Sequence, residues 1–183
     1  DQLGRFVLAR AGWLSETDAS YAYIRSAGVI KCSVPFGSGK DGGCTPLPAP
    51  LPYPKELASG DQLMVMANAV TVRMASVSVA CSNGEYHVFT VTPSGSGEHE
   101  FVSILTGNGI GTTLQGRTCT HWMSNAGNND AELTSSVMLL DGSGIPTGSL
   151  GFTASGGATS TQYQPSGGLP IHLNSRLVFR TDG

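Results

Sequence analysis

The chain has 183 residues, with 25 glycines, 10 prolines, 13% charged residues and a formal net charge of −3 at pH 7. This composition is typical of a turn-rich all-β protein, and the length suits one domain with a genuine core. The lysines and arginines are scattered along the chain, so they provide no basic surface for nucleic acid. No apolar run reaches the roughly 20 residues of a membrane helix, so we also expect no membrane insertion.

Residues 1–55 are expected to form an irregular, Pro/Gly-rich N-terminal arm with a proline-rich connector. Phe6–Ala9 could be a strand, and residues 16–27 leave two alternatives open, a short capped helix or a tyrosine-containing strand. Residues 33–55 contain alternating prolines, which lack the N–H donor and favour an extended, polyproline-like backbone outside any sheet. We interpret this stretch as a stiff connector, with docking to another subunit as the alternative.

Residues 56–183 are expected to form the main domain, built around a β-hairpin. Asn83 and Gly84 give the strongest short-range hairpin signal, because both residues tolerate the positive φ angles of a type I′ turn. A two-residue loop then fixes the register. The expected pairs are Ser82 with Glu85, Cys81 with Tyr86, Ala80 with His87 and Val79 with Val88. One face would carry Val77, Val79, Cys81, Tyr86 and Val88, and the other Ser78, Ala80, His87, Phe89 and Val91.

Other short strands are expected on both sides of this hairpin. They are Gln62–Ala67, Phe101–Leu105, Arg117–Ser124, Leu133–Leu140, Gly148–Ala154 and Leu177–Arg180. Within residues 117–124, alternation places Cys119, His121 and Met123 on one side and Trp122 on the other. About seven to nine short strands with frequent turns and no βαβ spacing predict an antiparallel β-sandwich or jelly roll.

The cysteines and histidines are candidates for disulfides or metal ligands. Cys32, Cys44, Cys81 and Cys119 lack zinc-finger spacing. Two alternatives are open: disulfides, of which Cys32–Cys44 with Cys81–Cys119 is the most local pairing, or free buried thiols that pack as small apolar groups. No two histidines have the i, i+2 spacing that places ligands on one strand face, so no metal is expected, and we assign no partner to His87.

The sequence carries no catalytic signature. It has neither a G-x-S-x-G motif nor a cluster of acids, and its glycine-rich loops precede no helix that could bind phosphate, so we expect no enzyme activity and no cofactor. The polar loops 107–111, 125–130 and 155–168 are the expected contact surface for a protein or a glycan. The candidate binding residues are Asn125, Asn128, Asn129, Asp130, Gln162, Tyr163, Gln164 and Trp13.

The C-terminal part is similar to a known class of proteins. The run GRTCTHWMSNAGNNDAELTSSVMLLDGSG, followed after a loop by GGLPIHLNSRLVFRTDG, resembles small β-sandwich proteins of tailed-phage virions, the head-decoration and tail-associated jelly rolls. In those proteins a strand ends in an Asn-rich turn, the returning strand ends in an Asp-Gly turn, and a late strand reads P-I-x-L-x-S-R-L-x-F-R. The resemblance covers residues 116–183. It implies a non-enzymatic protein at the virion surface that contacts copies of itself or other virion subunits, and possible binding to a host surface.

A second interpretation is a pilus-tip or fimbrial adhesin domain, secreted or on the cell surface, that binds a host glycan or protein. Such domains are also all-β and rich in Ser, Thr and Gly, and they carry disulfides because they fold in an oxidising compartment. A third, a secreted hydrolase on a jelly-roll scaffold, would need a cluster of acids or histidines that the sequence does not indicate.

Overall fold

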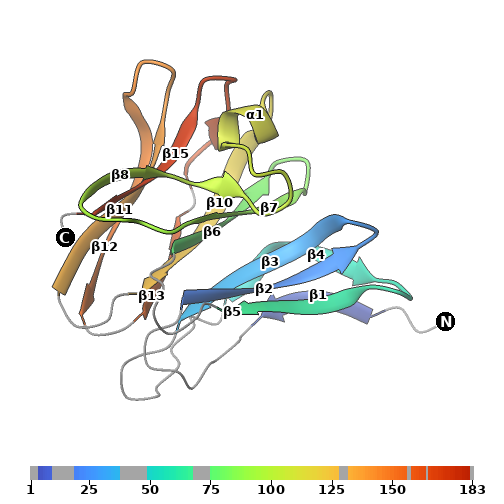
Figure 1. Cartoon of the computed structure of the whole chain (residues 1–183). Helices are drawn as coiled ribbons and strands as arrows, with labels where there is room; N and C mark the ends of the chain where they lie inside the picture. Colours follow the sequence, from blue (N-terminus) through green and yellow to red (C-terminus); the bar gives the residue numbers. More distant parts are fainter. Residues whose placement is uncertain are drawn as a thin grey trace.

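The computed structural model describes the backbone of residues 4–9, 19–37, 49–67, 75–127, 132–155, 158–163 and 165–181, and Figure 1 shows their arrangement. Every strand pair among these residues is antiparallel, which confirms the all-β prediction. Helical structure within the described ranges is limited to α1 (Ile110–Leu114). None of the described helical residues forms a segment with the length and apolar character needed to cross a membrane.

The central sheet contains the predicted hairpin. Its strands follow the order β13 (Ala158–Tyr163), β10 (Thr118–Gly127), β6 (Ala75–Cys81), β7 (Tyr86–Val91) and β9 (Val102–Ser103), and β14 (Leu169–Pro170) also pairs with β10. Every residue of β6 is buried. A strand directs alternate side chains to opposite faces, so both faces of the sheet are covered at β6, as the sequence predicts for this hairpin.

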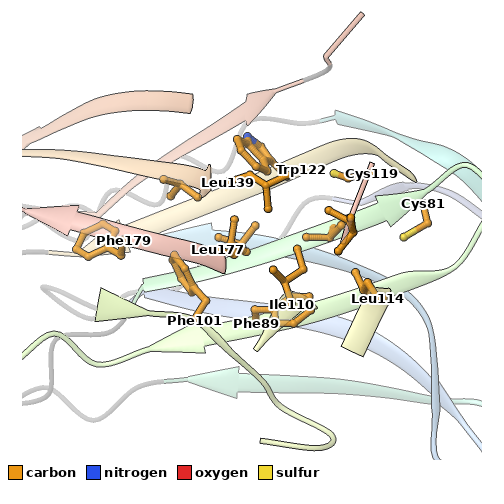
Figure 2. Packing of buried hydrophobic residues seen from close by; sticks show 14 of the residues in the cluster. Cys81, Phe89, Phe101, Ile110, Leu114, Cys119, Trp122, Leu139, Leu177 and Phe179 are labelled. Carbon is orange, nitrogen blue, oxygen red and sulfur yellow. The ribbon is translucent and has the colours of Figure 1, made fainter. Parts of the chain in front are cut away.

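A second sheet covers one face of the central sheet. It has the order β12 (Pro146–Ser155), β11 (Glu132–Leu140), β15 (Arg176–Thr181) and β8 (Gly97–Glu100). Between the two sheets lies the main core, part of which is drawn in Figure 2, where the rings of Phe101 and Phe179 meet edge to face with centroids 6.2 Å apart. The main core comprises Ala75, Val77, Val79, Cys81, Phe89, Phe101, Ile110, Leu114, Cys119, Trp122, Val137, Leu139, Ile171, Leu177 and Phe179.

A third sheet packs on the opposite face of the central sheet (Figure 1). It has the order β3 (Val29–Gly37), β2 (Ala19–Ser26) and β5 (Gln62–Ala67), so the strand alternative holds for residues 19–26. The second core joins these two sheets through Ile24, Ile30, Cys32, Ala80, Tyr86, Val88 and Met123. The buried hydroxyls of Ser33 and Ser78 hydrogen-bond to each other within this interface, and Ser78 Oγ also donates to Ser33 O at 3.0 Å.

Part of the proline-rich stretch forms a strand, contrary to our expectation. β4 (Ala49–Leu57) pairs with β1 (Gly4–Ala9) in a two-stranded sheet, with a register shift between Phe6 and Leu8. The pairs with β1 fall at residues 49–50 and 55–57 of β4, so Pro52 and Pro54, which lack an N–H donor, lie in the bulged stretch between the two paired parts. The expected irregular arm is therefore not confirmed where residues 4–9, 19–37 and 49–57 form strands, and the division at residue 55 remains a prediction.

The hairpin forms at the predicted place, but its register differs by one residue. The amide of Gly84 donates to Cys81 O at 2.8 Å, that of Cys81 donates to Glu85 O at 2.9 Å, and Gly84 has φ +81°. These features define a three-residue loop with glycine in the left-handed region, where we expected a two-residue type I′ turn. Tyr86 consequently pairs with Ala80, and the faces predicted for β7 are exchanged. Phe89 lies in the main core, and Tyr86 and Val88 lie in the second core.

Five other expectations are corrected. A register shift between Cys119 and His121 breaks the alternation of β10, so Cys119 and Trp122 share the main core while Met123 lies in the second core. Part of the expected loop 155–168 is strand β13, and β10 continues through Asn125 to Gly127. The expected strand 101–105 is shortened to β9, and the last part of the expected loop 107–111 begins α1.

Candidate functional site

A pocket of about 360 Å³ lies beside the tip of the β6–β7 hairpin. Residues from three separate parts of the chain line it: the start of β3, the start of β7 with the residue before it, and the segment from α1 to β10. We call it the hairpin pocket. Its lining residues are Val29, Ile30, Glu85, Tyr86, His87, Thr113, Gln115 and Arg117.

An ion pair between Glu85 and Arg117 lies in the wall of the hairpin pocket. Arg117 Nε donates to Glu85 Oε2 at 3.1 Å, and Arg117 Nη2 donates to Glu85 Oε1 at 3.3 Å. This is the two-pronged geometry in which a planar guanidinium matches a carboxylate. The Glu85 amide also donates to Asn83 Oδ1 at 3.1 Å, so the turn itself helps to position the acid.

His87 extends this ion pair into a three-residue cluster. Its Nε2 lies 3.4 Å from Glu85 Oε2, and its side chain is only 21% exposed. Burial lowers the pKa of His87 below its usual range, although the contact with Glu85 opposes this. Burial alone would raise the pKa of Glu85, but hydrogen bonds involving Arg117, Asn83 and His87 outweigh it and the pKa is lowered. At neutral pH the cluster therefore contains one carboxylate, one guanidinium and a neutral imidazole.

The cluster offers hydrogen-bonding groups that suit a neutral ligand. The charges of Glu85 and Arg117 cancel, and Gln115 adds an amide beside the apolar side chains of Val29 and Ile30. Within the described side chains, His87 contacts a carboxylate and no hydroxyl or thiol that it could activate as a nucleophile. The hydroxyl of Thr113, another lining residue, donates to Gly109 O at 2.8 Å.

The residues that the sequence pointed to lie elsewhere. Asn125 pairs with Ser76 and Ser160, at the end of β6 remote from the hairpin tip. Gln162 and Tyr163 belong to β13, opposite Met123 and Trp122, so our placement of Tyr163 in a loop was wrong. Their roles in binding stay predictions. Trp13, Asn128, Asn129, Asp130 and Gln164 fall outside the described residues, as does Cys44.

The cysteines within the described ranges are buried thiols. Cys32, Cys81 and Cys119 are not linked by a disulfide, and burial raises the pKa values of Cys32 and Cys81 to about 11 and that of Cys119 to about 12. His99, flanked by two glutamates, contacts Gly95 O at 2.8 Å through Nε2. No group of three or more His, Cys, Asp or Glu side chains among the described residues is placed to hold a metal ion.

The sequence contains a local signal for one of the two contacts in the His87 cluster, that between Glu85 and His87. Glu85 and His87 are two residues apart, and that spacing puts both side chains on one face of an extended segment. The expectation that His87 has no partner is therefore wrong. Arg117 lies 32 residues from Glu85 in the chain and is brought to it by the pairing of β10 with β6, which no local pattern indicates.

Acidification should destabilise the protein through His87. Since the folded-state pKa of His87 is lowered, the unfolded chain takes up the proton first, and stability is lost as the pH falls below about 6.5. Glu85, whose pKa is also lowered, adds a further loss near pH 4.

We expect the urea midpoint to fall less between pH 7 and pH 5 in His87→Gln than in the unmodified protein. His172→Gln, at an exposed histidine, is the control, and equal falls in all three proteins would contradict the expectation.

The hairpin pocket is thus a site within the described residues where polar groups from three parts of the chain converge. Its residues and contacts are the basis for a functional assignment, because comparison with known proteins supplies none. No protein-family model, no curated protein and no solved structure matches this chain.

Proposed function

We propose that the chain is a non-enzymatic structural protein of a virion, a capsid-decoration, tail or fibre component that binds copies of itself or other virion subunits. In this proposal the antiparallel sheets form a sandwich of the jelly-roll kind, and the protein acts by presenting a rigid surface. A pilus-tip or fimbrial adhesin domain that binds a host glycan or protein is the alternative.

The main support for this proposal is that charged side chains link separate strands and turns of the structure. Lys31 on β3 pairs with Asp61, before β5, at 2.5 Å. Arg176 on β15 pairs with Glu100 on β8 at 3.0 Å. Lys55 on β4 reaches the hairpin tip, where its Nζ donates to Gly84 O and lies 5.7 Å from the centre of the Tyr86 ring. Such contacts fix the relative positions of strands and turns, which suits a scaffold.

Features of residues 116–183 lend further support. The Asp-Gly turn of the resembling proteins corresponds to a turn in which Asp141 Oδ1 accepts the amides of Ser143 at 2.8 Å and Ile145 at 2.9 Å. The late strand of the pattern corresponds to β15, whose apolar residues Leu177 and Phe179 lie in the main core. In this proposal, that turn and β15 serve as the Asp-Gly turn and the late strand of the resembling layout.

The hairpin pocket favours a second candidate function, contact with a host glycan. Sugars are neutral and carry many hydroxyls, and the pocket offers a charge-balanced set of donors and acceptors beside two aliphatic side chains. Arg117 and Glu85 are 47% and 43% exposed, so a ligand can reach them directly.

Two measurements on the full chain test the proposal and separate the two functions. Size-exclusion chromatography with light scattering should give a mass above the 18.9 kDa of one chain, rising with concentration, and a strict monomer would contradict the virion assignment. A glycan array tests the pocket. If a glycan binds, Arg117→Ala should weaken it about tenfold or more, a loss expected for a charged hydrogen-bonding group.

Arg176→Ala is the matched control for the glycan measurement. The Arg176–Glu100 pair has nearly the same length and exposure as the Arg117–Glu85 pair but lies outside the hairpin pocket. Equal glycan binding by the two variants, or no glycan bound on the array, would rule out glycan recognition at the hairpin pocket. The virion assignment would then be tested by the mass measurement alone.

A further inference from the structure

Cys81 and Cys119 are cross-strand neighbours in the central sheet. Cys81 is the last residue of β6, Cys119 is the second residue of β10, and the antiparallel register pairs them directly. Both side chains belong to the main core and therefore lie on the same face of the sheet. Figure 2 shows both cysteines among the side chains of that core.

The hydrogen bonds around this pair identify its type. The amide of Ser82, one residue after Cys81, donates to the carbonyl of Thr118, one residue before Cys119, at 2.9 Å. The amide of Cys81 is directed away from β10 and donates to Glu85 O instead. Cys81 and Cys119 are therefore a non-hydrogen-bonded pair, the kind in which the Cα atoms of the two strands approach to about 4.5 Å.

That separation falls within the Cα range of about 4.4–6.8 Å that a disulfide spans. Cys32 has no such partner within the described chain, because it lies in the second core on the other face of the central sheet. We propose that Cys81 and Cys119 are a redox-active pair that closes a cross-strand disulfide when the protein meets a small-molecule disulfide such as oxidised glutathione. This inference does not depend on the proposed function.

The reaction proceeds by thiol–disulfide exchange. The Cys81 thiolate attacks oxidised glutathione, which forms a mixed disulfide and releases one glutathione thiolate. The Cys119 thiolate then attacks the Cys81 sulfur and releases the second glutathione. The protons of the two cysteine thiols pass to the two glutathione thiolates, so the protein loses two electrons and two protons and glutathione gains both.

Cys81 is the attacking residue because it adjoins the turn. Ser82, the next residue, is exposed, so local opening at the hairpin end uncovers Cys81 before Cys119. The thiols are buried when the sheet is closed, and their raised pKa values keep them protonated at pH 7. Oxidation should therefore be slow in the closed protein and faster in mild urea or at higher pH.

The bond would close a loop containing residues 82–118, which includes β7, β8, β9 and α1. Constraint of the unfolded chain by a loop of this length should raise the melting temperature by roughly 10 °C, and a thiol reductant should reverse the rise.

The test is oxidation of the reduced full chain with oxidised glutathione in mild urea, followed by removal of urea and peptide mapping without reduction. The expected product is a disulfide-linked peptide pair joined through Cys81 and Cys119. The rise in melting temperature on oxidation should persist in Cys32→Ala. It should be absent in Cys81→Ala and in Cys119→Ala. The mapping uses the unmodified chain, so it is decisive even where a variant fails to fold. Stable glutathione adducts without a Cys81–Cys119 link, or links only through Cys32 and Cys44, would overturn the inference.

Discussion

Replacement of Trp122 by alanine should lower the free energy of unfolding by about 3–5 kcal/mol, the usual cost of truncating a buried large aromatic side chain. Trp122 is fully buried in the main core on β10. It reaches the second sheet, since a Cβ added to Gly148 on β12 would lie 3.4 Å from Trp122 Cη2. A loss of this size is a large fraction of the roughly 5–15 kcal/mol that stabilise most domains. Urea denaturation followed by circular dichroism measures it.

Ile145→Ala is the control for Trp122→Ala. Ile145 is also a large apolar residue, but it lies in the turn between β11 and β12 with 61% of its surface exposed. Its truncation should change the free energy of unfolding by no more than about 0.5 kcal/mol. Similar small losses in the two variants would show that the indole does not fill the space between the two sheets.

The sequence was sufficient to locate the hairpin but not to fix its register. Asn83 and Gly84 marked the turn correctly because few residue types accept a left-handed backbone. The same two residues, however, fit both a two-residue loop and a three-residue loop ending in Gly84, and the second is observed. Since side chains alternate with a period of two, this one-residue difference moved Phe89 and Tyr86 to the faces opposite to those expected.

Other errors arose where tertiary contacts override local preference. The bulge after Cys119 interrupts the alternation of β10, and its Thr120 hydroxyl donates to Ala80 O at 3.1 Å, a partner 40 positions away in the chain. β13 has a polar, loop-like sequence and is identifiable as a strand only through its pairing with β10. β4 contains prolines yet pairs with β1, because its pairs fall at residues 49–50 and 55–57, on either side of Pro52 and Pro54.

The same distinction between local and distant contacts applies to the hairpin pocket. Its Glu85–His87 contact follows from spacing along one segment and was within reach of sequence reasoning. Its remaining walls come from β3 and from the segment between α1 and β10, and these meet the hairpin only through the packing of the third sheet and α1 against the central sheet. A candidate site assembled in this way cannot be found from polar loops alone, and the sequence therefore pointed to the loops 107–111, 125–130 and 155–168 instead.

The substitution Gly111→Ala, in α1, should also lower the free energy of unfolding. The amide of Gly111 donates to Ser175 O at 3.1 Å, so the helix backbone lies directly on the loop before β15. A Cβ at this position would lie 2.6 Å from Ser175 O and 2.9 Å from the carbonyl carbon of Leu173, and closer still to Leu173 O. Because these are backbone atoms of a packed loop, they cannot rotate aside. We expect a loss of about 1–3 kcal/mol, the usual cost of overpacking.

Gly95→Ala is the matched control, because a Cβ there meets no atom within 4 Å and the residue has no positive φ. This substitution should be neutral or stabilise the protein by up to about 1 kcal/mol through the unfolded state. Gly111→Ala should also move the amide resonances of Thr113 and Gln115, since both residues follow Gly111 into the wall of the hairpin pocket. Equal stability of the two variants, with unmoved pocket resonances, would mean that α1 is not held against the Leu173–Ser175 backbone and does not shape the pocket.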